Sequence, residues 1–527
     1  MSSPARAQAW ADNWAPGRVA RTLAWAIILA LPLLWQLGGT LLFDVDEGAF
    51  SEATREMLQS GDWGHTTLNG APRFDKPLGI YWLQSLSVAV FGLNEWALRL
   101  PSALSCWAMA LALGAFAGRR WGRTTGALAS IIAVTSIGPL AIGRTATADA
   151  LLNLLLVLAG LDLWRFVESG ARATLRRAYV WVALGILVKG PVALLVPGAA
   201  FVLWCVGGKR WSLLRTAALD MRGWALLLVV ALPWYLYALH RHGMAFVEGF
   251  LLRHNVDRFT GTVGGHAGNP LYYLLILPLL AMPWAPLLAS VIARWRETWR
   301  DPLGRYLLGW SGFVLAFFSL SATKLPHYVL YGFAPLVLLM ARALTQAGRR
   351  MRIALACSFA LWAVLAAGLP WLVLHLAPSV RDPLYRALLG GAEPPVWIAA
   401  ACAVGLILLL AFWPGPGEKV QRRLAAAAGV LAVYVGGWVL PWFGEALQGP
   451  VRHAAQVAAA RGGPVVQWQF HLPSFAVYAG RIAPLREPGP QEMALTRVAR
   501  LPSGDDGRPR LFEERGIVLL GPRAAEH

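Results

Sequence analysis

The stretch FDVDEGAF, residues 43–50, places three carboxylates directly after a long apolar run, with Asp46 and Glu47 at its centre. The stretch RFDKP, residues 73–77, follows and adds Lys76. Ionisable groups close to lipid are costly and are usually retained for function. A cation binds an anionic group and stabilises it as it leaves, while a carboxylate orients an acceptor or removes its proton. The pattern therefore indicates group transfer at a membrane surface.

The composition is that of a chain that crosses a membrane many times. Of its 527 residues, 57% are hydrophobic and 14% are charged, whereas a soluble protein carries about 25% charged residues. We predict an all-α polytopic fold of about 13 spans, since apolar runs near the ~20 residues that cross a bilayer recur throughout. Residues 78–92 are either a further span or a helix at the interface. The expected spans are 19–42, 97–117, 124–141, 147–166, 176–188, 190–207, 223–240, 270–291, 305–322, 326–345, 353–374, 396–413 and 423–441.

The distribution of lysine and arginine orients these spans. With a cytoplasmic N-terminus, every loop predicted to face the cytoplasm is basic, and the first external loop, 43–96, is rich in acids. An odd number of spans then places the C-terminal segment, 443–527, on the external side. The basic loops lie near residues 119–123, 165–177, 209–222, 294–305, 342–352 and 419–423.

Residues 443–527 differ in composition from the membrane part, 1–442. GPVVQWQF, SFAVYAGR and GIVLLG predict short strands between Gly and Pro turns. A segment of this length suffices for a small α/β domain outside the membrane. The N-terminal apolar run has no small-residue cleavage site before the acidic stretch, so we expect an uncleaved first span.

Two other classes of protein or site are disfavoured. The net charge of +19 is spread over short clusters between apolar runs, without a basic face carrying stacking aromatics, so no nucleic-acid partner is expected. The four cysteines lack the spacing of a disulfide pair or a CxxC metal site. We expect small core residues at Cys106, Cys205, Cys357 and Cys402.

The predicted topology brings further reactive side chains to the external face. GRTATADALL places Asp149 at the start of a span, and LVKGP places Lys189 between two spans. RHNVDRFTG contributes His254 and Arg258, with His266 shortly after. Such a set suits a substrate that is part lipid and carries a phosphate, as in sugar transfer from a polyprenyl phosphate. SATKLPHYVLYG adds a cation, an imidazole and two phenols, at Lys324, His327, Tyr328 and Tyr331.

Each residue also has a structural explanation. Asp46, Glu47 and Asp149 stand where an acid stabilises the first turn of a helix. Lys76 has a carboxylate beside it for a local ion pair, and Lys324 stands where a lysine extends toward the headgroups. The conjunction of these groups on one face, rather than any single one, favours function.

The same stretches resemble a known family. VDEGAFSEATREMLQSGDWGHTTLNGAPRFDKPLGIYWL and FGLNEWALRLPSAL are similar to the first external loop of bacterial C-type glycosyltransferases of the protein O-mannosyltransferase superfamily. That superfamily includes the transferases that add 4-amino-4-deoxy-L-arabinose to lipid A. The resemblance covers residues 20–345 in order, and LPSFAVYAGR is similar to the family's external domain. The later motifs are TADALL, LVKGPVALLVP, HNVDRFTG, NPLYYLLILPLLAMPWAPLL and KLPHYVLYGFAPLVLLMA.

The resemblance implies a GT-C fold, an undecaprenyl-phosphate sugar donor and inversion at the sugar carbon. It also implies a site at the periplasmic surface of the bacterial inner membrane. Position by position, Asp46 matches the family's first-loop catalytic acid and Asp149 its second acid, with Glu47 a neighbouring candidate. Binding of the donor phosphate is assigned to Lys76, with further candidates at Arg258, Tyr328, Tyr331 and Lys324.

Asp75 and His254 stand where some members of the family bind a divalent metal ion. Two ligands are few for such a site, so no cofactor is taken as required. Many aminoarabinose transferases carry FEKP, whereas Asp75 is one methylene shorter. GRTATADALL is also more similar to the broad superfamily than to the enterobacterial lipid A enzymes.

These departures leave the sugar and the acceptor open. Aminoarabinose transfer to lipid A is the first hypothesis, and transfer of a mannose-type hexose to protein or another glycan is the second. A lipid A phosphate is already anionic, so Asp46 would orient substrate, whereas a hydroxyl acceptor requires a base.

Two hypotheses come from other classes of protein. A transporter or flippase predicts ionisable residues near mid-bilayer and repeat-related broken helices. A scaffold whose external tail binds a partner leaves the acidic loop and its DKP motif without a role.

Overall fold

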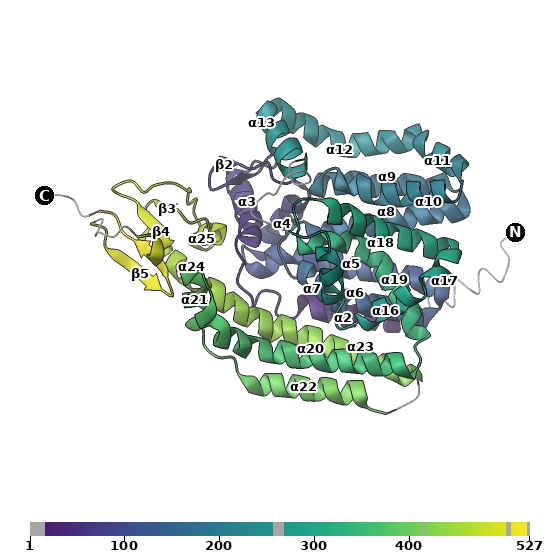
Figure 1. Cartoon of the computed structure of the whole chain (residues 1–527). Helices are drawn as coiled ribbons and strands as arrows, with labels where there is room; N and C mark the ends of the chain where they lie inside the picture. Colours follow the sequence, from purple (N-terminus) through teal and green to yellow (C-terminus); the bar gives the residue numbers. More distant parts are fainter. Residues whose placement is uncertain (1–15, 257–267, 415–416, 502–506, 524–527) are drawn as a thin grey trace.

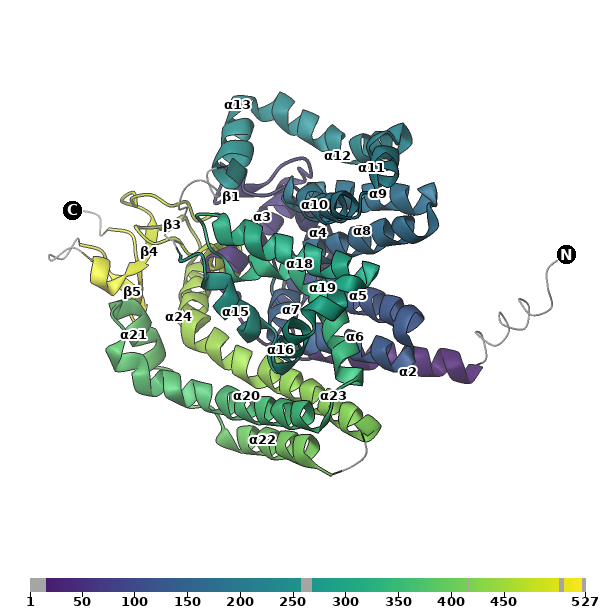
Figure 2. The same cartoon turned by 45° about the vertical axis from the view of Figure 1, so that its right-hand side comes forward.

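The computed structural model describes residues 16–256, 268–414, 417–501 and 507–523. Long helices lie side by side in a bundle (Figure 1), and a small sheet domain packs at one end of it (Figure 2). The bundle helices are α2 Pro16–Leu34, α5 Glu95–Trp121, α6 Arg123–Thr135, α7 Ile137–Gly143, α8 Asp149–Ser169, α9 Arg172–Lys189, α10 Val192–Gly207, α12 Met221–His242, α15 Tyr272–Leu280, α16 Pro286–Ala293, α18 Pro302–Leu320, α19 Phe333–Thr345, α20 Arg349–Leu376, α22 Trp397–Phe412 and α23 Gly417–Tyr434.

Shorter elements connect these helices. They are α11 Trp211–Ala218, α13 Met244–Phe246, the π-helix η1 Val247–Val256, α17 Trp295–Arg300, the 3-10 helices η2 Pro326–Gly332 and η3 Ala377–Ser379, and α21 Pro383–Gly390.

Each predicted span corresponds to a helix, or to consecutive helices, in the described part of the chain. Seven helical segments there are long and apolar enough to cross a membrane, and the pair α6 and α7, bent by 63°, raises the number to eight. The apolar stretches of α2, α10 and α22 are shorter. The all-α polytopic prediction is confirmed.

Small residues set the closest helix contact, between α5 and α6. A Cβ built on Gly126 would lie 2.6 Å from the carbonyl oxygen of Gly114 and 2.8 Å from Cα of Gly118. Close approach of backbones through small residues is the usual means of helix association in lipid. Gly122, which joins the two helices, has a φ of 93°, a conformation that favours glycine.

The first external loop folds into two helices and a two-stranded ribbon. They are α3 Asp46–Ser60, β1 Thr67–Leu68, β2 Ala71–Pro72 and α4 Gly79–Phe91. Helix α4 has 13 residues and is about 20 Å long, which is shorter than the about 30 Å hydrocarbon core. It packs against α3 and α5. The ambiguous stretch 78–92 therefore forms a short helix within the loop.

The last membrane helix does not stop near residue 442. Helix α23 continues through the π-helix η4 Val435–Val439 into α24 Leu440–Arg461, as one helical segment from Lys419 to Arg461 that contains an apolar stretch long enough to cross a membrane. The proposed boundary between 442 and 443 falls inside this segment. Helix α21 contacts α24, and Leu384 and Leu388 from it join the core of the small domain.

The small domain holds a four-stranded sheet of β3 Val465–Gln467, β4 Met493–Arg497, β5 Arg510–Glu514 and β6 Ile517–Leu520. The strand order is β3-β4-β6-β5, with β3 parallel to β4 and the other pairs antiparallel. The α/β character predicted for the tail is confirmed.

One strand prediction in the tail is wrong. SFAVYAGR forms helix α25, Pro473–Ala479, because Pro473 suits the first helical turn and Gly480 closes the helix in the left-handed conformation. Helix α25 packs against α3 and α24.

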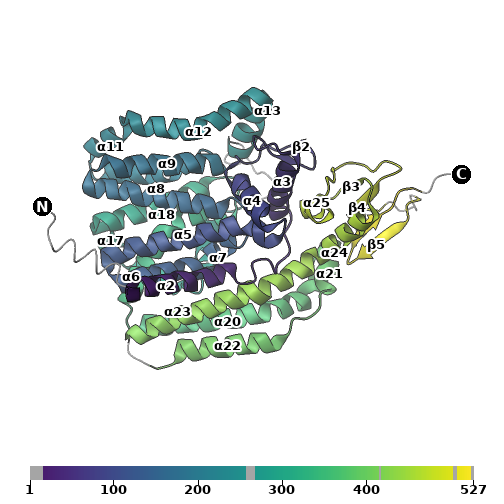
Figure 3. The ribbon, with the colours of Figure 1, turned by 180° about the vertical axis from the view of Figure 1, so that it is seen from behind.

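The two ends of the bundle carry different elements. Helices α3 and α25 and the sheet lie at one end, and α11 and α17 lie at the other, in the views of Figure 1 and Figure 3. The first end holds the acidic loop, and the second holds two of the basic loops. All four cysteines are free, and the expectation of core positions is right for Cys106 and Cys205, which are buried, but wrong for Cys357 and Cys402, which are exposed.

Candidate active site

The three carboxylates of the opening motif have different surroundings. Glu47 is buried, with 2% of its surface exposed, while Asp46, one residue earlier, is exposed at the start of α3. Asp44 lies in the turn before that helix. Consecutive side chains of an α-helix point in directions about 100° apart, so neighbours in the sequence meet different environments.

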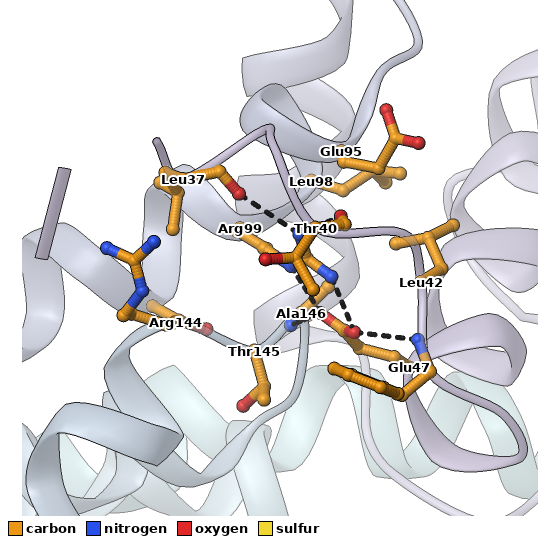
Figure 4. A network of polar contacts seen from close by, with 12 residues as sticks. Leu37, Thr40, Leu42, Glu47, Glu95, Leu98, Arg99, Arg144, Thr145 and Ala146 are labelled. Carbon is orange, nitrogen blue, oxygen red and sulfur yellow. Dashed lines mark hydrogen bonds and ion pairs between the residues drawn. The ribbon is translucent and has the colours of Figure 1, made fainter. Parts of the chain in front are cut away.

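Glu47 is held by a buried arginine (Figure 4). Arg99, from α5, donates from Nε to Glu47 Oε1 at 2.6 Å and from Nη2 to Oε2 at 2.8 Å. The backbone N–H groups of Phe43 and Ala146 complete the carboxylate, at 3.0 and 2.7 Å. Arg99 also donates to three backbone carbonyls, those of Leu37, Thr40 and Leu41.

This arrangement gives Glu47 a structural role, and the catalytic role considered from the sequence stays a prediction. Both oxygens are fully used, and the side chain joins the acidic loop to α5 and to the start of α8. Arg144 acts similarly, because it donates to the carbonyls of Pro32 and Leu33 at the end of α2.

Asp44 joins the acidic loop to the small domain. Its carboxylate accepts hydrogen bonds from the backbone N–H of Ser474, at 3.0 Å, and from the Ser474 hydroxyl. Nearby, the Tyr478 hydroxyl accepts from the N–H of Leu42 at 2.8 Å. Both partners belong to α25, so the helix that was expected to be a strand supports the loop that carries Asp46.

The Asp44 contact predicts a pH-dependent stability. Burial is the main cause that raises the pKa of Asp44 to about 7, and the negative Glu47 adds to it, while the Ser474 bonds oppose it. The folded protein therefore retains a proton between pH about 4 and 7 that the unfolded chain has released. The contribution of Asp44 to the free energy of unfolding should fall by up to about 1.4 kcal/mol per pH unit across that window.

Thermal unfolding of the wild type and of Asp44→Asn, from pH 4.5 to 8, measures this effect. The wild type should lose stability relative to the variant as the pH rises toward 7, and the difference should level off above it. A difference that is constant with pH contradicts the raised pKa.

Asp46 is the carboxylate of the motif that the protein itself does not engage. Within the described residues its side chain makes no hydrogen bond and no ion pair, and it is exposed at the first position of α3. Its charge nevertheless acts on Arg73 of the same loop and on His327 of η2. An unengaged carboxylate in reach of cations is the feature expected of a group that orients or deprotonates an acceptor.

The second predicted acid, Asp149, lies in a polar cluster at the same end of the bundle. Lys189 Nζ, at the end of α9, lies 2.5 Å from Asp149 Oδ1. The hydroxyl of Tyr331 donates to the same oxygen at 2.9 Å and accepts from Lys189 at 2.8 Å. The Nε2 atom of His327 is 3.6 Å away. Asp149 is thus buried and charge-balanced, and it fixes the positions of Lys189 and Tyr331.

His327 links the two acids. The charges of Asp149, Lys189, Asp46 and Lys76 all act on its ring. These residues come from α8, α9, α3, the first loop and η2, so the structure brings together the groups that the topology predicted to share one face. Tyr328, predicted as a phosphate ligand, is buried beside them with its ring centroid 5.5 Å from Lys189 Nζ.

The RFDKP stretch supplies a compact charged group. Lys76 Nζ lies 3.1 Å from Asp75 Oδ1, and Arg73 Nη2 lies 3.0 Å from Asp75 Oδ2. Both cationic side chains are about nine-tenths buried, with 10% and 8% exposed. Lys76 stays the predicted ligand of the donor phosphate, and its charge acts on His327.

The residues present do not form a metal site in the part of the chain that the structure describes. No group of three His, Cys, Asp or Glu there is placed to hold an ion. Each oxygen of Asp75 already faces a cation, which opposes binding of another. The His254 side chain, the second predicted ligand, lies outside the described residues, so the metal stays a prediction and no step is assigned to it.

Lys324 has a different position from the predicted one. Its ammonium donates to the carbonyl oxygens of Phe318, at 3.1 Å, Ser319, at 2.6 Å, and Ser321. All three donors are therefore committed to the C-terminal end of α18, where a cation is also favoured by the helix dipole. Lys324 therefore closes that helix end, a structural role, and its assignment to the donor phosphate stays a prediction. Arg258 and His266 lie outside the described residues.

Three residues of the site were not assigned a role from the sequence. Lys189 was placed on the correct face, but its partner was not foreseen, because Asp149 lies 40 positions away. Arg99 is one arginine within an apolar helix, and the cost of burying it was the available signal. Arg73 lies two positions before Asp75 in the RFDKP stretch, but it was given no role from the sequence.

The sequence and the fold of this chain are similar to those of known proteins. A family model described as dolichyl-phosphate-mannose-protein mannosyltransferase matches residues 75–237. The crystal structure of ArnT from Cupriavidus metallidurans bound to undecaprenyl phosphate shares the fold, with a TM-score of 0.79 over 97% of this chain and 99% of that one, at 21% identity.

Two curated relatives show the family. Both are named undecaprenyl phosphate-alpha-4-amino-4-deoxy-L-arabinose arabinosyl transferase, the second with the suffix 2. The one from Erwinia tasmaniensis is 31% identical over 439 residues, 80% of this chain and 76% of that protein. The one from Sodalis glossinidius is 33% identical over 433 residues, 76% of each chain. The resemblance stated from the motifs is confirmed, and this chain belongs to the undecaprenyl phosphate-4-amino-4-deoxy-L-arabinose arabinosyl transferase family of membrane glycosyltransferases.

Proposed function

We propose that this protein transfers 4-amino-4-deoxy-L-arabinose from undecaprenyl phosphate to a phosphate of lipid A. The observation that carries the proposal is the free Asp46 carboxylate in electrostatic reach of Arg73, in the same short loop as Lys76. The names of the curated relatives, which specify this sugar and this lipid phosphate, support the donor. Lipid A as acceptor rests on the family resemblance.

The reaction is an inverting displacement at the anomeric carbon. An oxygen of the acceptor phosphate attacks that carbon as its bond to the donor phosphate oxygen breaks, and the bonding electrons leave with undecaprenyl phosphate. Lys76 stabilises the phosphate that leaves, as its negative charge grows. The acceptor phosphate is already anionic, so Asp46 orients the reacting groups and need not remove a proton.

The buried groups hold this arrangement. Asp149 neutralises Lys189 and positions Tyr331, whose hydroxyl is bonded to both. Glu47 and Arg99 fix the start of α3, which carries Asp46 at its first position. A reacting geometry that is prepared in advance avoids the cost of ordering it during the reaction.

The orientation in the cell is part of the proposal. Basic loops at the opposite end of the bundle favour a cytoplasmic location for that end. The site and the small domain then face the periplasm across the bacterial inner membrane. The transporter hypothesis is not needed for the charged clusters described here, since they lie at helix ends.

Mass spectrometry of lipid A tests the proposal. The host lacks its own transferase but makes the aminoarabinose donor, and it expresses either the wild type or Asp46→Asn at equal levels in the membrane. We expect lipid A heavier by one aminopentose with the wild type alone. Unchanged lipid A at confirmed expression contradicts the acceptor, and labelled protein or glycan in that case identifies the hexose-type alternative.

A further inference from the structure

Arg73 is the charged side chain of the site that the reaction above does not use. It follows the β2 strand, and 8% of its side chain is exposed. Nη2 is bonded to Asp75, and the guanidinium carbon lies 5.2 Å from the centre of the Phe50 ring. Nε and Nη1 are buried and have no hydrogen-bond partner within the described residues. Buried donors on a charged group are costly to leave unpaired.

A neighbour of Arg73 also has a buried polar group without a hydrogen-bond partner. The hydroxyl of Tyr81 is buried without a partner in the described structure, and it lies within electrostatic reach of Arg73. The Tyr81 ring stacks on Phe50 with centroids 5.4 Å apart. Guanidinium N–H groups with a hydroxyl nearby suit an anion with several acceptor oxygens.

The surroundings of Asp75 disfavour a metal ion at its carboxylate. Arg73 Nη2 faces Oδ2 and Lys76 Nζ faces Oδ1. A divalent ion at this carboxylate would lie against two positive side chains, in a place where the guanidinium already supplies positive charge.

We propose that Arg73 is a further phosphate-binding residue, and that its guanidinium replaces a divalent metal ion beside Asp75. The inference rests on the proposed function for the identity of the phosphate. Undecaprenyl phosphate and the lipid A phosphate present the same chemistry to the unpartnered nitrogens Nε and Nη1 of Arg73. Arg73 binds one of these phosphates through its charge and the N–H groups of its planar guanidinium, whereas a lysine supplies only a compact point charge.

The experiment compares full-length wild type, Arg73→Gln, Arg73→Lys and Arg241→Gln, purified in detergent. Arg241 is the matched control, because it also pairs with an aspartate, Asp62, but is 36% exposed. Affinity for undecaprenyl phosphate is measured by native mass spectrometry, transfer to lipid A by kinetics, and bound metal by elemental analysis before and after EDTA. Thermal unfolding of each variant checks the fold.

Removing the guanidinium in Arg73→Gln should weaken phosphate binding by about 10- to 100-fold, since hydrogen bonds to charged groups are strong. If the ligand is the donor, Arg73→Gln raises the Kd for undecaprenyl phosphate. If it is the acceptor, that Kd is unchanged and the KM for lipid A rises by a similar factor. Arg73→Lys should recover part of the loss, and Arg241→Gln should behave as wild type. The wild type should carry no stoichiometric metal and should keep its affinity in EDTA.

Three results overturn the inference. In the first, both Arg73 variants match the wild type in Kd and KM. In the second, the wild type holds one metal ion per chain and loses phosphate binding in EDTA. In the third, the wild type fails to bind undecaprenyl phosphate, which also removes the proposed donor. A wild type that binds undecaprenyl phosphate but leaves lipid A unmodified contradicts the proposed acceptor alone, and the Kd comparison still decides the role of Arg73.

Discussion

Asp46→Asn should lower the turnover of sugar transfer by about 100-fold or more while leaving the protein folded. The substitution removes a negative charge and keeps nearly the same shape. Asp46 makes no bond to the rest of the described structure, so its loss leaves no buried group without a partner. The effect should appear in kcat, because a group that orients the reacting atoms contributes mainly in the transition state.

The measurement is a transfer assay with purified protein, donor and lipid A, with kcat and KM determined separately. Glu487→Gln is the matched control, since this exposed acid lies on the small domain at the same end of the bundle and its carboxylate has no partner in the described structure. Glu487→Gln should keep full activity. Near-normal turnover in Asp46→Asn, at unchanged thermal stability, would show that Asp46 does not act on the substrates.

Arg99→Ala should have the largest effect on stability, a loss of about 3–5 kcal/mol. Arg99 is 1% exposed and satisfies both oxygens of Glu47 and three backbone carbonyls. Its removal leaves a buried carboxylate without its cation. The loop that carries Asp46 is anchored by the same contacts, so activity should fall with stability.

Thermal unfolding in detergent measures this loss, and the control lies on the same helix. Arg120, at the other end of α5, forms an exposed ion pair with Glu168 at 3.2 Å, and Arg120→Ala should cost at most about 1 kcal/mol. The double variant Arg99→Met with Glu47→Gln should recover part of the stability, because no unpaired charge remains. If Arg99→Ala is no less stable than Arg120→Ala, the buried pair does not anchor the loop.

The membrane part of this fold is predictable from the sequence because its signals are local. Apolar length locates the spans, and the lysine and arginine distribution orients them. The helix of the last predicted span continues beyond residue 441, because Val451, Ala454 and Ala458 of α24 pack into the core of the small domain. SFAVYAGR was misassigned because its apolar residues suit a strand, whereas Pro473 and the contacts of α25 with α3 and α24 stabilise a helix.

The sequence predicts which residues lie on the face of the site, but not which of them bond to one another. The sequence indicates that Asp46, Lys76 and Asp149 share one face, since topology alone requires it. It does not distinguish the free carboxylate of Asp46 from the engaged one of Glu47, one position later. That distinction depends on Arg99, 52 residues away, and the role of Lys324 depends on three carbonyls whose directions only the folded helix end defines.

The bonds of Leu42 and Asp44 to Tyr478 and Ser474 span 436 and 430 positions of the sequence. During synthesis the N-terminal part of a chain emerges first, so the loop with Asp46 is made long before the helix that supports it. The bonds from α25 to this loop form only after that helix has left the ribosome and docked. Until then the loop depends on the contacts between Glu47 and Arg99, which are synthesised early. The loop is thus held by one set of contacts that can form early in synthesis and one that can form only near its end.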